Sequence, residues 1–170
     1  MELSRSTLCR WVRETAELFR PLYDLMCRRV CSSAAIHTDD TPVRVQDRNL
    51  PRTRTGRFWV YVGDADHPYS VYAYTPSRKR DGPAKFLAGY KGYLHADAFA
   101  GYDGIYVSGE VKQVLCWAHA RRKFFEARTA QPVLAHAALA YIGRLYDVER
   151  AAKRLAETID LPDRAARQAW

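Results

Sequence analysis

The sequence is poor in the features that mark several classes of protein. Its 170 residues include only four cysteines, which form no CxxC pair, so a disulfide scaffold is excluded and a reduced, cytoplasmic setting is expected. No stretch approaches the roughly 18 apolar residues of a membrane-spanning helix. Segment 1–8 lacks the apolar centre of a signal peptide. Acidic residues are outnumbered, 19 against 27 Lys and Arg, and this net charge of +8 favours a polyanion as partner.

The remaining composition is that of a globular domain. Apolar residues make up 48% of the chain and charged residues 27%, and the length suffices for one domain with a hydrophobic core. Short apolar or aromatic runs bounded by turn residues predict strands, and an irregular extension at 42–45 follows the first one. The second and third strands form a predicted hairpin. The five predicted strands are 34–39, 58–62, 69–74, 92–97 and 111–117.

Helix-like spacing of apolar residues predicts helices at both ends of the chain. Residues 1–30 read as helical, divided at Pro21, because proline interrupts a helix. A short helix begins at Pro83, and long helices follow Ala118. In 134–159 apolar residues recur at alternating steps of four and three, which predicts one continuous apolar face. This order of strands and helices predicts an α/β fold with a mixed sheet and helices on its faces.

Two predicted strands end in an aspartate, at Asp39 and Asp97. Sites in α/β sheets form beyond the carboxyl ends of strands, so two such strands side by side would bring both carboxylates together. Two carboxylates at such a short separation repel each other unless a cation lies between them, and hard oxygen ligands favour Mg²⁺ or Mn²⁺. A third carboxylate from a helix would complete a two-metal site for phosphodiester chemistry. Aspartates that only form turns are the alternative interpretation.

Several segments, in order, resemble the central domain of IS66-family transposases over roughly residues 33–150. They are HTDDTPV from His37, TRTGRFWVYV from Thr53, PSR from Pro76, FLAGYKGYLHADAFAGY from Phe86, CWAHARRKFF from Cys116 and IGRLYDVE from Ile142. The resemblance implies a ribonuclease-H-like five-stranded mixed sheet flanked by helices, preceded by an N-terminal helical extension. It also implies a DDE catalytic triad that uses divalent metal, with two Mg²⁺ (or Mn²⁺) ions, to cleave and join DNA strands during transposition.

The family motifs carry over to single positions of this chain. Asp39 matches the first acid of H-x-D-E-T, Asp97 matches the acid of A-D-x-x-x-G-Y, and Glu149 matches the end of L-Y-x-x-E. These three are the predicted catalytic and metal-binding residues. Glu126 is the runner-up to Glu149, and a surface ion pair is the alternative role for each of the two glutamates. The predicted supporting or DNA-contacting residues are His37, Asp40, Cys116, His119, Arg121, Arg122, Lys123, Arg57 and Arg78.

Some of these residues keep other interpretations. The family usually has glutamate where Asp40 stands, which could alter the geometry around the site. Cys116 and His119 could suggest zinc, but they supply half a tetrahedral site and no second pair has suitable spacing. Two basic loops, 47–57 and 75–82, could hold phosphates or be solvated surface. Arg48 belongs to the first of them.

The length of the chain bears on its activity. Intact family members are several times longer, so we expect a fragment, with residues 1–32 as a helical linker or a remnant of a helix-turn-helix, 33–160 as the catalytic domain and 161–170 as a frayed tail. The expected partners are DNA, a second copy of the chain and accessory proteins of the element, at the bacterial nucleoid. The alternatives are a non-catalytic remnant that binds DNA or self-associates, and an unrelated metal-dependent nuclease.

Overall fold

The chain divides into two compact units, residues 1–115 and residues 116–170. The computed structural model describes residues 3–47 and 51–158, and side chains as far as residue 155. The predicted tail at 161–170 and Arg48 of the first basic loop therefore lie outside the described residues. Across the described parts, no helix combines the length and apolar character needed to cross a membrane. All four cysteines are free thiols.

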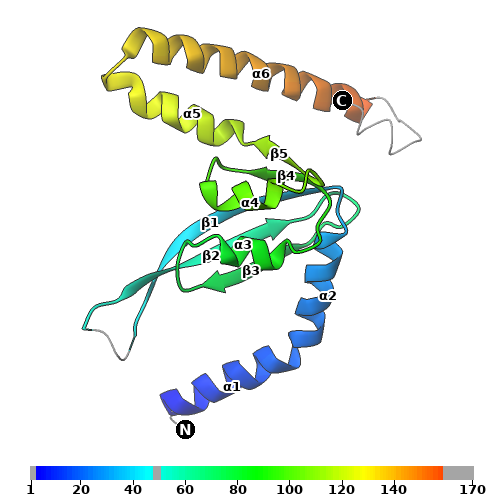
Figure 1. Ribbon diagram of the computed structural model, residues 1–170, viewed down its shortest axis with the longest axis vertical. Helices are drawn as coiled ribbons and strands as arrows, with labels where there is room; N and C mark the ends of the chain where they lie inside the picture. The colour runs from blue at the N-terminus through cyan, green and yellow to red at the C-terminus, as the bar shows by residue number, and fades with distance from the viewer. Residues whose placement is uncertain (1–2, 48–50, 159–170) are drawn as a thin grey trace. The chain divides into compact units, whose positions relative to one another are not determined.

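The first unit contains a five-stranded sheet in the order β3-β2-β1-β4-β5 (Figure 1). β1 pairs antiparallel with β2, which pairs antiparallel with β3, while β4 runs parallel to both β1 and β5. This mixed order is that of a ribonuclease-H-like fold, so the predicted fold class is confirmed. The strands are β1 (Ala35–Val45), β2 (Arg54–Val62), β3 (Ser70–Thr75), β4 (Gly92–Ala96) and β5 (Val111–Leu115).

The first two strands are longer than predicted. β1 continues through Pro42 and pairs with β2 from His37 to Val45, so the irregular extension expected at 42–45 is wrong. β4 ends at Ala96 and pairs with β1 only from Ala35 to His37, so the later part of β1 is an edge strand, where proline is tolerated. The residues from Arg54 onward, expected in a basic loop, form the start of β2.

Helices precede and interrupt the sheet. The side chain of Ser4 caps α1 (Arg5–Leu18) by accepting a hydrogen bond from the backbone N–H of Thr7 at 3.1 Å. α2 (Arg20–Cys31) begins immediately afterwards with Pro21 in its first turn, as the proline predicts. Three short helices follow within the unit: α3 (Asp81–Phe86), η1 (Ala100–Tyr102) and α4 (Asp103–Tyr106).

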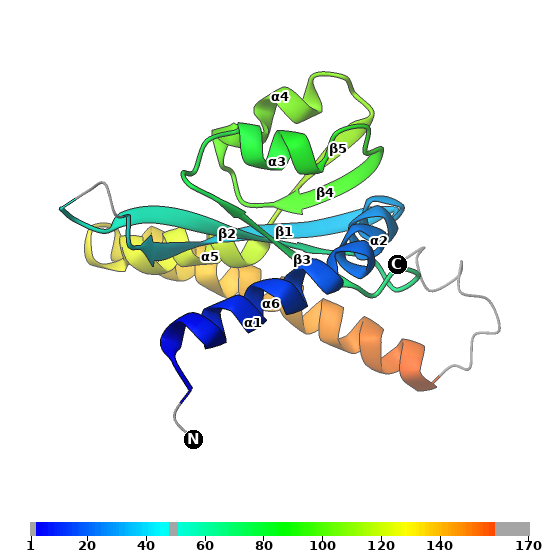
Figure 2. The same ribbon diagram turned by 90° about the horizontal axis from the view of Figure 1, so that it is seen from below.

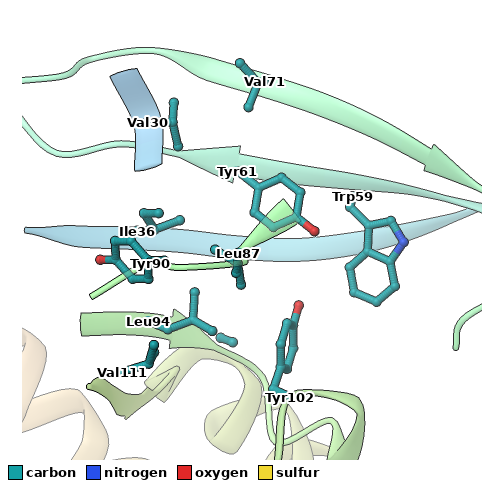
Figure 3. Close-up of a cluster of buried hydrophobic side chains, with 11 residues drawn as sticks. Val30, Ile36, Trp59, Tyr61, Val71, Leu87, Tyr90, Leu94, Tyr102 and Val111 are labelled. Atoms are coloured by element: carbon teal, nitrogen blue, oxygen red, sulfur yellow. The ribbon is translucent and has the colours of Figure 1, made fainter. Parts of the chain in front are cut away.

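The core of the first unit lies on one face of the sheet, the face that α3 and α4 cover (Figure 2). Ile36 of β1, Trp59 and Tyr61 of β2 and Leu94 of β4 are fully buried there, and Val30 brings the end of α2 into the same cluster (Figure 3). Trp59 and Tyr61 alternate with more exposed neighbours, as aromatic residues on a half-covered strand should. The opposite face presents exposed Phe58, Tyr72, Tyr74, Tyr93 and Val114.

The second unit is a helical hairpin. It comprises α5 (Trp117–Glu126), η2 (Ala127–Thr129) and α6 (Pro132–Thr158). α5 and η2 both contact α6, and among the α6 side chains described, as far as residue 155, those of Ala135 and Ile142 are buried. The predicted apolar face is not the buried one. Leu134 and Tyr141, which belong to it, directly precede the buried Ala135 and Ile142, and Leu134, Tyr141 and Val148 are each about two thirds exposed.

Truncating a core side chain tests this packing. Leu94→Ala should lower the free energy of unfolding by about 2–5 kcal/mol, because it removes a fully buried side chain and leaves a cavity. Val107→Ala, at a site 85% exposed, is the matched control and should cost less than about 0.5 kcal/mol. Urea unfolding followed by circular dichroism measures both, and equal costs would contradict the assignment of the core.

Candidate active site

The carboxyl end of β4 lies next to the first half of β1. These strands are parallel neighbours, and His37 is directly opposite His95. Asp39 and Asp97 each stand two residues beyond this pair, Asp39 within β1 and Asp97 immediately after β4. Two acids that are 58 residues apart in the sequence thus follow the paired histidines at equivalent positions. The prediction that a strand ends at each aspartate holds for β4 but is wrong for β1, which continues to Val45.

Asp39 and its neighbour Asp40 face opposite sides of the sheet. Along β1 the buried residues Ile36 and Thr38 alternate with the exposed His37 and Asp39, because successive side chains of a strand point to opposite faces. Asp39 therefore lies on the exposed face, where its Oδ1 accepts a hydrogen bond from the backbone N–H of Asp40 at 2.8 Å. The side chain of Asp40 lies on the core side and is only 2% exposed.

Two arginines neutralise the buried Asp40. Arg57 of β2 donates from Nη1 to Asp40 Oδ2 at 2.9 Å. Arg78, from the loop between β3 and α3, donates from Nε to Asp40 Oδ1 at 2.8 Å, and its Nη2 lies 2.7 Å from the same oxygen. A buried carboxylate requires such partners, since removing an unpaired charge from water is costly. Both arginines are among the residues predicted to support the site or to contact DNA, and both bind Asp40 in this structure.

Arg78 also reaches Asp97. Its Nη2 donates to Asp97 Oδ2 at 2.9 Å, and its guanidinium lies over the ring of Phe99, 4.2 Å from the centroid. Asp97 Oδ1 accepts the backbone N–H of Phe99 at 3.2 Å, which fixes the carboxylate after the strand ends. Partial burial by itself would lower the pKa of Arg78, but the hydrogen bonds and negative charges of Asp40 and Asp97 outweigh it and raise that pKa.

His37 and His95 form a contact pair beside the aspartates. Their Nδ1 atoms are 2.5 Å apart, and their rings meet edge to face with centroids 4.5 Å apart. Burial lowers the pKa of His37, and the nearby His95 lowers it further. A neutral His37 can share a single hydrogen bond with His95, whereas two charged rings at this distance would repel each other.

The profile described as "Transposase IS66 family" matches residues 1–170. The chain belongs to this family. It is 35% identical over 142 residues to the uncharacterized protein y4hP of Sinorhizobium fredii. The aligned region covers 77% of this chain and 25% of y4hP. Two more uncharacterized proteins of the same organism are similar: y4qI (29% identity, 74% of this chain and 26% of that protein) and y4jD (28% identity, 87% and 32%). The chain spans about a quarter to a third of the length of these relatives.

The two candidate glutamates belong to the second unit, whereas Asp39 and Asp97 belong to the first. Glu149 is an exposed residue of α6, and its carboxylate pairs with Lys153 at 2.9 Å. A hydrogen bond from Lys153 and its charge lower the pKa of Glu149. Glu126 ends α5 and pairs with Lys123 at 3.4 Å. The surface ion pairs weighed as alternatives for both glutamates are thus present.

The C-W-A-H motif of the family stands at the start of α5. Cys116 is the residue before the first turn, and its carbonyl accepts the backbone N–H of His119 at 3.1 Å. The basic residues Arg121, Arg122 and Lys123 follow one turn later on the same helix. The motif therefore forms the N-terminus of α5, and a positively charged turn follows it.

The carboxylates of Asp39 and Asp97 are donors of the chemical kind that a magnesium ion prefers, although Asp97 shares Arg78 with Asp40 on the core side of β1 and Asp39 lies on the exposed face. Mg²⁺ is commonly bound by one or two carboxylates, with water and substrate phosphate oxygens as its other ligands, and Asp39 and Asp97 supply two carboxylates. Within residues 3–47 and 51–158, no three His, Cys, Asp or Glu side chains are grouped closely enough to hold a metal ion. A site here would thus take its further ligands from outside this pair.

The sequence did not indicate the pairing of Arg78 with Asp40 and Asp97. The alternation of faces along β1 could have shown that Asp39 and Asp40 point apart, because adjacent residues of a strand always do. The position of Arg78 depends on how the loop after β3 folds over the sheet edge. No periodicity in the sequence marks that arrangement.

The histidine pair gives a pH prediction. His95→Ala should raise the pKa of His37 towards its ordinary value, because it removes a neighbouring charge and admits water. NMR titration of the His37 ring protons measures this. Because folding depresses the pKa of His37, its contribution to stability is complete above the ordinary histidine pKa and is lost as the pH falls towards the lower, folded value. A His37 pKa that does not change in His95→Ala would contradict the coupling.

Proposed function

We propose that this chain is the catalytic core of a DDE-type transposase that cleaves and joins DNA strands during transposition of an insertion sequence. The observation that supports the proposal best is the parallel pairing of β1 with β4, in which Asp39 and Asp97 each follow the paired residues His37 and His95 by two positions. Membership of the IS66 family supports the same reading. The proposed activity is that of a protein as long as the relatives, of which this chain spans about a quarter to a third.

Each residue has a distinct part in the proposed chemistry. Asp39 and Asp97 hold divalent metal, Mg²⁺ or Mn²⁺, which when bound activates an attacking oxygen and stabilises the departing one. Glu149 is the proposed third acid, and to serve as a ligand it must exchange its partner Lys153. His37 lies two residues before Asp39 on the same exposed face of β1 and is proposed to support the site from there. Cys116 and His119 are proposed to support it through the hydrogen bond that begins α5.

DNA is the proposed partner, bound through its phosphates. Arg121, Arg122 and Lys123 form a positively charged turn on α5 that can contact phosphate oxygens without reading sequence. A second copy of the chain and accessory proteins of the element are further proposed partners. We place the protein in the bacterial cytoplasm, at the nucleoid when it is bound to DNA.

A metal titration of this chain tests the proposed site. Mn²⁺ should bind in a manner detectable by electron paramagnetic resonance, and Asp39→Asn or Asp97→Asn should weaken binding by about tenfold or more, because each removes a carboxylate ligand. Asp103→Asn, an exposed acid on α4, is the matched control and should change nothing. Absence of Mn²⁺ binding at millimolar metal would favour a non-catalytic remnant instead.

The same substitutions distinguish the proposed reactions in a protein extended to the length of its relatives. Asp39→Asn, Asp97→Asn and Glu149→Gln should abolish metal-dependent strand transfer and leave DNA binding largely intact, whereas Glu126→Gln should stay active. Loss in Glu126→Gln with retention in Glu149→Gln would reassign the third acid. Cleavage of arbitrary DNA without end joining would favour the unrelated nuclease.

The basic turn on α5 predicts a salt dependence. Arg121→Ala and Arg122→Ala should each reduce the slope of log K against log salt concentration by about 0.9 for duplex DNA, the value for one lost phosphate contact. Lys91→Ala, which removes an equal charge from a residue paired with Glu110, is the control and should leave the slope unchanged. Fluorescence anisotropy at several salt concentrations measures it. An unchanged slope in all three variants would exclude α5 from the DNA interface.

A further inference from the structure

Arg78 already contacts one of the two proposed metal-binding carboxylates, through its Nη2 and Asp97 Oδ2 at 2.9 Å. We propose that Arg78 is the resident counter-ion of Asp97: it holds this carboxylate in the metal-free protein and competes with divalent metal for it. This inference rests on the proposed function, because it concerns metal at the same site. It assigns to Arg78 a positioning role in addition to any contact with DNA.

The arginine is anchored independently of Asp97. Its Nε donates to Asp40 Oδ1 at 2.8 Å, the Asp40 side chain is 2% exposed, and the Phe99 ring supports the guanidinium plane. Arg57 binds the other oxygen of Asp40 from β2. Asp40 and Arg57 thus fix Arg78 from the sheet side, and Asp97 is reached by one nitrogen of a guanidinium that is already in place.

This geometry lets the contact with Asp97 open without releasing the arginine. Only the bond from Nη2 to Asp97 has to break for metal to take the carboxylate, while the bond from Nε to Asp40 can persist. The four groups, two arginines and two aspartates, carry no net charge together. A divalent ion that arrives at Asp97 therefore meets a carboxylate whose charge is already compensated, and it is repelled by the guanidinium a few ångströms away.

A neutral residue at position 78 should therefore strengthen metal binding. Arg78→Gln should lower the dissociation constant of Mn²⁺ by about fivefold or more at low salt, because a positive charge next to Asp97 is removed. Arg78→Lys keeps the charge and should stay within about threefold of the unchanged protein. Arg80→Gln removes the same charge from an exposed residue of the same loop and is the matched control. A gain in affinity is informative because a merely structural arginine could only weaken the site when lost.

The measurement is a Mn²⁺ titration by electron paramagnetic resonance on the intact chain, with circular dichroism to verify folding and Arg78→Ala as a second neutral variant if Arg78→Gln does not fold. An Arg78→Gln affinity equal to that of Arg80→Gln, or weaker than that of the unchanged protein, would overturn the counter-ion role. Asp97→Asn separates the two proposals. If Mn²⁺ binding is lost in Asp97→Asn but unaffected by Arg78→Gln, only the role of Arg78 fails; if binding is absent throughout or persists in Asp97→Asn, the proposed metal site itself fails.

Discussion

The parallel pairing of β1 with β4 is the constraint on which the proposed site depends. The chain makes an antiparallel hairpin and a third strand before it returns to the other edge of β1, and backbone hydrogen bonds at Ala35, Ile36 and His37 then fix the register. That register places Asp39, within β1, at the level just beyond the end of β4, where Asp97 stands. A sheet in which β4 paired with β3 instead would contain the same residues and would separate the two aspartates by the width of three strands.

Two consecutive aspartates acquire opposite characters from this sheet. Asp39 faces outward, while Asp40 is buried beside Trp59, its partner across the strands, and needs both Arg57 and Arg78 to compensate its charge. The arginine that satisfies the buried aspartate is the same one that reaches Asp97. The guanidinium of Arg78 therefore contributes both to the stability of the fold and to the electrostatics of the proposed site. Removing its charge from the site also removes a partner of the buried Asp40 carboxylate.

Local patterns predicted what depends on local chemistry. The division of the N-terminal helical segment near Pro21, the strands rich in aromatic residues and the fold class followed from spacing and composition, together with the resemblance. The extension of β1 through Pro42 was missed because a proline is acceptable only where the neighbouring strand has ended, and this depends on the length of β4. Arg78 was identified as basic but not as a partner of Asp40, since that contact joins segments 38 residues apart. The apolar spacing on α6 showed which residues share a face, but it carried no information on which face α5 would cover.

Because Asp39 and Asp40 are adjacent, the pairing register of β1 with its neighbours decides which of the two aspartates is buried. In most strands a shift of the register by one residue moves apolar side chains to the solvent and polar ones into the core, which is unfavourable. Here it would also exchange two identical acids: the outward one would enter the core beside Trp59 and the buried one would be exposed. The side chains alone could not distinguish these two arrangements of aspartate. The flanking residues do so, because Ile36 and Thr38 belong inside and His37 belongs opposite His95. Insertions or deletions within this strand should consequently be rarer among natural variants than changes in the loops that join it.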